Sequence, residues 1–146
     1  MAKIIRLERA DPGRVFVDSG AWIAGLIRSD QHHARAVTLW EQLRREAVRI
    51  VTSTFVLDEV LTFTRYREGL PAARRLGESI LRSSLVHLVD VDRHCVDRAW
   101  ELFTANPDAE PSFTDCTSFA LIERLRIGRV FTFDDDFRAT GAELLR

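Results

Sequence analysis

The chain gathers acid near its carboxyl end, where the stretch FTFDDDF, residues 131–137, carries three consecutive aspartates behind an apolar run. Two bare charges of the same sign that stand 4 Å apart near a protein surface repel by about 4 kcal/mol. Such a group of carboxylates needs protons or cations that offset the repulsion. A hard divalent cation does this best, and Mg²⁺ and Mn²⁺ prefer oxygen ligands.

A second acid stands far away in the sequence but at an equivalent place. Asp18 directly follows the short apolar run 15–17, and Asp134 follows the apolar run 129–133. Both runs have the β-branched and aromatic character of buried strands. Because ligands of open parallel sheets bind at the carboxyl ends of the strands, we expect both aspartates at one edge of the sheet.

Two predicted helices carry further acids. On the helix predicted over 54–67, a helical wheel places Asp58 on the solvent side and Glu59 at the border of the apolar face, where a carboxylate needs a partner. Asp115 begins the helix predicted over 114–125, behind a capping Thr114, where the helix dipole alone could account for an acid. Asp18, Glu59, Asp115 and Asp134 can thus converge, but separate caps and surface charges remain the alternative.

The elements that must position these acids are strands alternating with helices. This order predicts a three-layer α/β fold with a mainly parallel sheet. We expect strands near 15–17, 49–52, 85–91, 129–133 and 143–145, with helices near 21–27, 31–43, 54–67, 71–83, 93–104 and 114–125. A length of 146 residues suits one domain, which we place at 15–146 behind an N-terminal extension over 1–14.

Composition limits the classes of function. The net charge of −1 lacks the global basic signature of a nucleic-acid binder, although a metal ion can neutralise an acidic site locally. No apolar run suits a membrane span or a signal peptide, so we expect a cytoplasmic protein. Cys95 and Cys116 lack metal-type spacing and are expected to be free, buried thiols. Lys3 is the only lysine, which argues against a phosphoacceptor response domain, because that class needs a lysine late in the chain.

Four motifs in order resemble the PIN-domain nucleases, and above all the VapC-type toxins of type II toxin–antitoxin pairs. They are V-D-S-G-A-W at 17–22, S-T-F-V-L-D-E-V at 53–60, S-F-T-D-C at 112–116 and T-F-D-D-D-F at 132–137. The resemblance runs from about Val15 to the C-terminus. It implies a parallel five-stranded sheet between helices and an acidic pocket that holds Mg²⁺ or Mn²⁺.

The resemblance also assigns roles to residues. The catalytic set that it implies is Asp18, Glu59, Asp115 and Asp134. Asp18 and Asp115 would hold the primary metal, and Glu59, Asp134 and Asp136 could form a second site. Ser19 and Thr114 would support the site. Ser19-Gly20 replaces the threonine-asparagine that is commoner in the family, and Ser19 keeps a hydroxyl near the metal.

The implied activity is endoribonuclease cleavage of structured RNA such as tRNA or rRNA, with a cognate antitoxin as inhibitor. Apolar surface on the helices near 54–67 and 70–83 could pair two copies in a homodimer or receive an antitoxin helix. Two alternatives stay open: a housekeeping RNA-processing nuclease, and a PIN-like RNA- or protein-binding module with little catalysis.

Overall fold

A computed structural model describes residues 13–146, and its centre is a five-stranded sheet in which every neighbouring pair of strands is parallel. The strand order is β3-β2-β1-β4-β5. The strands are β1 (Arg14–Val17), β2 (Arg49–Ser53), β3 (Val86–Val89), β4 (Arg129–Phe131) and β5 (Glu143–Leu145). The three-layer α/β fold with a parallel five-stranded sheet is thereby confirmed.

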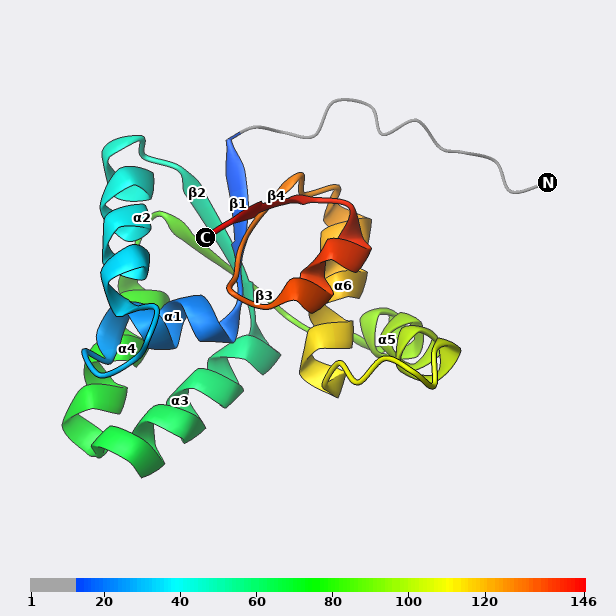
Figure 1. Cartoon of the computed structure of the whole chain (residues 1–146), viewed down its shortest axis with the longest axis horizontal. Coiled ribbons are helices and arrows are strands. Elements are labelled where there is room, and N and C mark those ends of the chain that lie inside the picture. Colours follow the sequence, from blue (N-terminus) through cyan, green and yellow to red (C-terminus); the bar gives the residue numbers. More distant parts are fainter. Residues whose placement is uncertain (1–12) are drawn as a thin grey trace.

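Helices cover both faces of this sheet. They are α1 (Ser19–Leu26), α2 (His33–Arg45), α3 (Thr54–Glu68), α4 (Leu70–Arg82), α5 (Arg93–Ala105) and α6 (Phe113–Leu125). Figure 1 shows α1, α2 and α4 on one side of the sheet and α5 and α6 on the other. Both faces of the central strands are therefore covered, and Val15, Phe16 and Val17 are fully buried.

Two details differ from the sequence prediction. Helix α6 begins at Phe113 and is capped by Ser112, so Thr114 is not the cap. The segment behind β4 forms a 3₁₀ helix, η1 (Asp135–Thr140), where no helix was predicted. Its six residues are too few to show a helical period, so the sequence pattern gave no signal there.

A tryptophan pair holds α1, which follows Asp18 directly. The rings of Trp22 and Trp40 lie 4.5 Å apart between their centroids, and the Trp40 indole N–H donates to the Ala21 carbonyl at 3.1 Å. Gly25 makes this packing feasible, because a Cβ at this position would stand 2.6 Å from Trp40 Nε1. The start of α1 is therefore fixed relative to α2.

Three further predictions have different outcomes. Cys95 and Cys116 are buried and free, as predicted. In the part of the chain that the structure describes, no helix has the length and apolar character needed to cross a bilayer. The proposed extension over 1–14 lies mostly outside the described residues and stays a prediction.

Candidate active site

Asp18 stands at the carboxyl end of β1, inside the sheet edge rather than on its surface. Its residue is only 6% exposed, and its backbone N–H donates to the Phe131 carbonyl at 3.1 Å. The Thr132 hydroxyl donates to Asp18 Oδ2 at 3.1 Å. Burial, followed by the charge of Asp115, raises the pKa of Asp18 from 3.8 to about 7.

Thr132 links the two strand ends that carry the first and the last acidic motif. While its hydroxyl donates to Asp18, the same oxygen accepts the backbone N–H of Asp134 at 3.0 Å. Asp134 in turn caps η1, because its Oδ1 accepts the backbone N–H of Asp136 at 2.9 Å. One hydroxyl therefore fixes Asp134 relative to Asp18.

Glu59 lies in the second turn of α3, and its position corrects the prediction of a core-border carboxylate. The residue is exposed, as is Asp58. Its partner is Ser19, whose hydroxyl donates to Glu59 Oε2 at 2.8 Å. Partial burial raises the pKa of Glu59, and the charges of Asp115 and Asp58 add to the rise, while the Ser19 hydrogen bond opposes it.

Asp115 occupies the first turn of α6 in a capping box. Its Oδ2 accepts the backbone N–H of Ser112 at 2.9 Å, and its own N–H donates to Ser112 Oγ at 3.0 Å. Burial still raises the pKa of Asp115, and the charges of Asp134 and Asp136 contribute to the rise. The Thr114 carbonyl accepts the Thr117 hydroxyl at 2.6 Å, and the supporting role expected for Thr114 stays a prediction.

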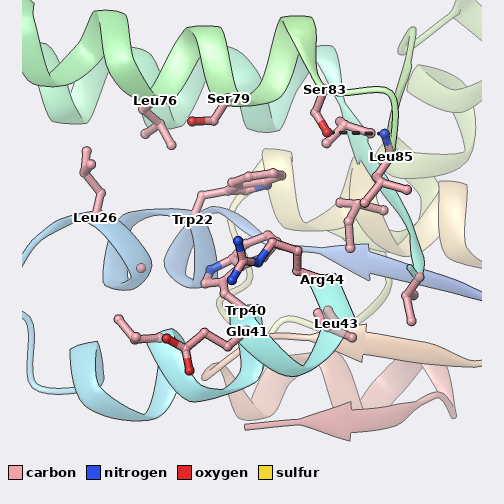
Figure 2. Close-up of a pocket in the computed structure, with 15 residues that line it drawn as sticks. Trp22, Leu26, Trp40, Glu41, Leu43, Arg44, Leu76, Ser79, Ser83 and Leu85 are labelled. Carbon is pink, nitrogen blue, oxygen red and sulfur yellow. Dashed lines mark hydrogen bonds between the residues drawn. The ribbon is translucent and has the colours of Figure 1, made fainter. Parts of the chain in front are cut away.

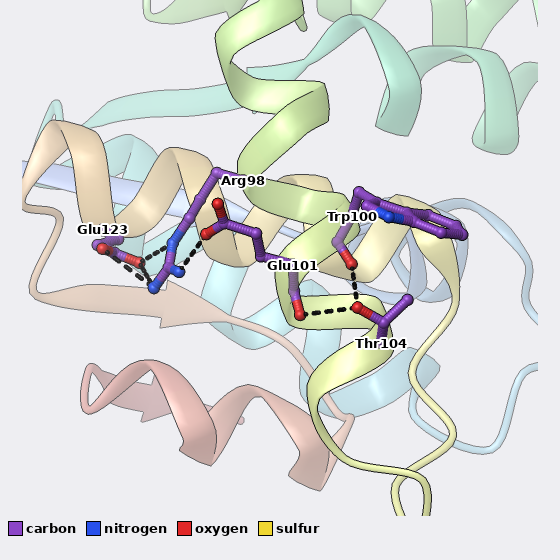
Figure 3. Close-up of polar contacts among 5 residues, drawn as sticks. All are labelled: Arg98, Trp100, Glu101, Thr104 and Glu123. Carbon is purple, nitrogen blue, oxygen red and sulfur yellow. Dashed lines mark hydrogen bonds and ion pairs between the residues drawn. The ribbon is translucent and has the colours of Figure 1, made fainter.

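An ion-pair bridge holds α6 against α5. The Arg98 guanidinium donates to Glu101 on its own helix at 2.9 Å and to Glu123 on α6 at 3.1 Å, as Figure 3 shows. A second pair joins Arg124 of α6 to Asp92, the cap of α5, at 3.0 Å. Both contacts fix the direction of α6 and therefore the place of its first turn.

Acids from the other three motifs interact electrostatically with Asp115. Asp115 raises the pKa of both Asp18 and Glu59, and Asp134 and Asp136 raise the pKa of Asp115. Within residues 13–146, no arginine or histidine pairs with Asp18, Glu59 or Asp115. No cationic side chain of the described residues therefore offsets the charge that these carboxylates carry.

The middle aspartate of FTFDDDF is separate from this group. Asp135 accepts from Arg138 at 3.1 Å and from Arg146 at 2.7 Å. These two guanidinium groups hold the pKa of Asp135 below its usual range. The structure thus divides the three consecutive aspartates between the acidic site and an ion pair with the last residue of the chain.

The donor set suits a hard divalent cation, since it consists of carboxylates with hydroxyls behind them. Within the described residues, no three acidic, histidine or cysteine side chains already form a group that could hold a metal ion. The metal roles expected for Asp18, Asp115, Glu59, Asp134 and Asp136 therefore stay predictions.

An apolar groove of about 470 Å³ lies on the helical face formed by α1, α2 and α4. Figure 2 shows Trp22, Trp40 and Leu76 lining it, while Glu41 and Arg44 come from α2. The groove borders α1, which begins one residue after Asp18.

Comparison with known proteins identifies the family. The profile of the PIN domain matches residues 15–143, nearly the whole described chain. The chain belongs to the PIN domain family. This PIN domain is 33% identical over 127 residues to the 23S rRNA-specific endonuclease VapC20 of Mycobacterium tuberculosis, which covers 87% of this chain and 94% of that protein.

Solved structures agree with this assignment. The crystal structure of Mycobacterium tuberculosis VapC20, a sarcin–ricin loop cleaving toxin, matches with a TM-score of 0.80 and 32% identity over 88% of this chain and 95% of that one. VapBC2 from Rickettsia felis matches with a TM-score of 0.67 and 14% identity, covering 90% and 96% of the two chains, and shows the fold alone. The resemblance to VapC-type PIN domains that the four motifs indicated is confirmed.

Sequence reasoning missed two hydroxyls of this PIN domain. The Thr132 hydroxyl donates to the Asp18 carboxylate, and the Ser112 hydroxyl accepts the backbone N–H of Asp115, yet neither residue was singled out. The signal for Ser112 was present, because Ser112 and Asp115 have the spacing of a capping box. The role of Thr132 depends on the pairing of β1 with β4, which local sequence does not specify.

Proposed function

We propose that this PIN domain is a Mg²⁺- or Mn²⁺-dependent endoribonuclease that acts as the toxin of a VapBC-type pair and cleaves rRNA. The observation that carries the proposal is that Asp18, Glu59, Asp134 and Asp136 all interact with Asp115, while no cationic side chain of residues 13–146 pairs with Asp18, Glu59 or Asp115. The similarity to VapC20, a 23S rRNA-specific endonuclease, supports rRNA over tRNA as the substrate class. An RNA substrate fits action in the cytoplasm.

The proposed roles follow the positions of the side chains. Asp18 and Asp115 would hold the primary cation, and Glu59, Asp134 and Asp136 would hold a second cation or orient water around the first. A bound cation supplies an activated water and relieves the charge that develops on the leaving oxygen. Ser19 and Thr132 orient carboxylates through the hydrogen bonds described above. Thr114, in the first turn of α6 next to Asp115, would also support the site.

A cleavage assay tests the catalytic part of the proposal. The substrate is a synthetic RNA stem-loop with the sarcin–ricin loop sequence, incubated with the protein and Mg²⁺ or Mn²⁺. We expect site-specific cleavage that EDTA abolishes and that Asp18→Asn reduces at least a hundredfold. Cleavage that survives both EDTA and Asp18→Asn would exclude this mechanism. Binding without cleavage under every condition would favour the alternative of a binding module.

The partner that we propose is an antitoxin with an apolar segment. We propose that this segment binds in the apolar groove beside α1. The groove is lined by Trp22 and Trp40, and Glu41 and Arg44 also line it (Figure 2). Expression of the protein should arrest growth, and co-expression of the antitoxin should restore it. Arg44→Glu, a change at an exposed residue that lines the groove, should weaken that rescue while RNA cleavage persists. Absence of growth arrest would favour a housekeeping RNA-processing nuclease.

A homodimer is also proposed. Trp100 and Phe103 on α5 are 59% and 44% exposed, and their rings stack with centroids 6.1 Å apart. Exposed aromatic pairs of this kind are typical of contacts between chains. Light scattering should give twice the monomer mass, and a monomer at micromolar concentration would contradict this part of the proposal.

A further inference from the structure

The hairpin of α3 and α4 carries an exposed surface that the site described above does not use. Tyr66 is 88% exposed and Phe63 is 43% exposed, both on α3. Next to Tyr66, a groove of about 560 Å³ runs between the two helices, and its lining combines the arginines Arg65 and Arg74 with Glu78 and the leucines Leu70 and Leu81. At 88% exposure, the Tyr66 ring packs little against the residues that the structure describes.

This surface is continuous with the acidic site along one helix. Phe63 follows Glu59 by four residues and Tyr66 follows it by seven, so all three lie on nearly the same face of α3. Seven residues of α-helix rise about 10 Å. Figure 1 shows α3 running outward from the end of β2. The side chains of Phe63 and Tyr66 thus form a row along α3 that extends from Glu59 away from the sheet.

The charge of the hairpin differs from that of the whole chain. The whole hairpin, residues 54–82, contains five arginines and four acidic residues, a net charge of +1. Its outer part, residues 60–82, contains the same five arginines and only two glutamates, a net charge of +3, whereas the whole chain has a net charge of −1. Arg65, Arg74 and Arg75 are exposed, and no acidic side chain of the described residues pairs with them. Such guanidinium groups can bind phosphates, and the exposed aromatic ring beside them can stack on a base.

We propose that the α3–α4 hairpin binds the RNA substrate outside the cleavage site, with Tyr66 stacking on an unpaired base and Arg65 and Arg74 contacting phosphates. This inference depends on the proposed ribonuclease function. The occupant is RNA and not an apolar protein segment because the outer part of the hairpin, residues 60–82, has a net charge of +3 and exposes Arg65, Arg74 and Arg75. It would place unpaired nucleotides about 10 Å from Glu59 along α3.

Kinetics on the stem-loop RNA test the inference. Tyr66→Ala should raise KM about fivefold or more with kcat unchanged, and Tyr66→Phe should retain the wild-type KM because it keeps the ring. The double variant R65Q/R74Q should reduce the slope of log affinity against log salt concentration by about 1.4 to 1.8, the amount expected for two phosphate contacts. Arg45→Gln, an exposed and unpaired arginine on α2, is the matched control.

The outcomes separate this inference from the proposed function. Affinity is measured in EDTA by fluorescence anisotropy, so it is readable whether or not cleavage occurs. If the wild type cleaves the RNA and the variants have the same KM and the same salt slope as the wild type, the inference about the hairpin is wrong and the proposed function still holds. Variants that change only the oligomeric state would overturn the inference in favour of a protein contact. If the wild type binds the RNA, Tyr66→Ala weakens this binding and no cleavage occurs, the proposed ribonuclease function is wrong but the RNA-binding surface is supported.

Discussion

Replacing Asp18 by asparagine should stabilise the metal-free fold at neutral and alkaline pH. Burial and the charge of Asp115 raise the pKa of Asp18 from 3.8 to about 7. Between these two values the folded state keeps a proton that the unfolded state has lost. The free energy of unfolding therefore falls as pH rises through this window, and the loss is complete above the folded pKa. Asparagine cannot ionise, so it removes this loss.

The size of the effect follows from the shift. One pKa unit corresponds to about 1.4 kcal/mol, so a rise from 3.8 to about 7 costs the ionised fold about 4 kcal/mol. About 2 to 3 kcal/mol of this falls between pH 5 and pH 8. Asparagine also keeps an oxygen that can accept the Thr132 hydroxyl. The gain of Asp18→Asn over wild type should therefore be larger at pH 8 than at pH 5 by about 2 to 3 kcal/mol.

Urea unfolding in EDTA at pH 5 and pH 8 measures this difference. Asp108→Asn, an exposed residue in the loop behind α5, is the control and should follow the wild type at both pH values. Mn²⁺ should then stabilise the wild type more than Asp18→Asn, because the variant lacks the anionic ligand. A gap between Asp18→Asn and wild type that is the same at pH 5 and pH 8 would refute the reasoning.

Three other substitutions test how the site and its supports are built. Ser19→Ala removes the hydrogen bond to Glu59 and should lower cleavage or Mn²⁺ affinity about tenfold, and unchanged values at limiting Mn²⁺ would count against a positioning role. Gly25→Ala places a Cβ 2.6 Å from Trp40 Nε1 and should destabilise the fold by about 1 to 3 kcal/mol in urea unfolding; a neutral effect would show that Trp40 can move freely. Ser112→Ala removes the cap of α6 and should cost about 1 kcal/mol by the same measurement, whereas no cost would mean that the capping box adds nothing.

Much of the fold could be predicted from the sequence, because each strand is a short β-branched run and each helix has an amphipathic period. The apolar run 15–17 lies in β1, and Pro71 stands at the start of α4. The edge that receives Asp18 and Asp134 followed from parallel pairing alone. Where burial of apolar side chains determines the structure, the local hydrophobic pattern and the rules of parallel sheets are therefore enough to predict it.

The details of the site were harder to predict because they depend on side-chain partners from distant segments. Glu59 was expected at a core border, but its partner Ser19 lies 40 residues earlier and keeps the carboxylate at an exposed rim. Thr114 was expected to cap α6, yet Ser112 two residues earlier makes that contact. A helical wheel predicts the direction in which each side chain points. It does not predict whether a neighbouring helix covers that side chain or leaves it exposed.

The rate of RNA cleavage as a function of Mn²⁺ concentration tests the central claim most directly. The comparison uses the wild type, Asp115→Asn and Asp135→Asn on the sarcin–ricin loop RNA. If the acids around Asp115 form one metal-dependent site, the wild type and Asp135→Asn will saturate alike, and Asp115→Asn will be at least a hundredfold slower at every Mn²⁺ concentration. Equal cleavage by Asp115→Asn and the wild type, or cleavage by the wild type without metal, would contradict the account.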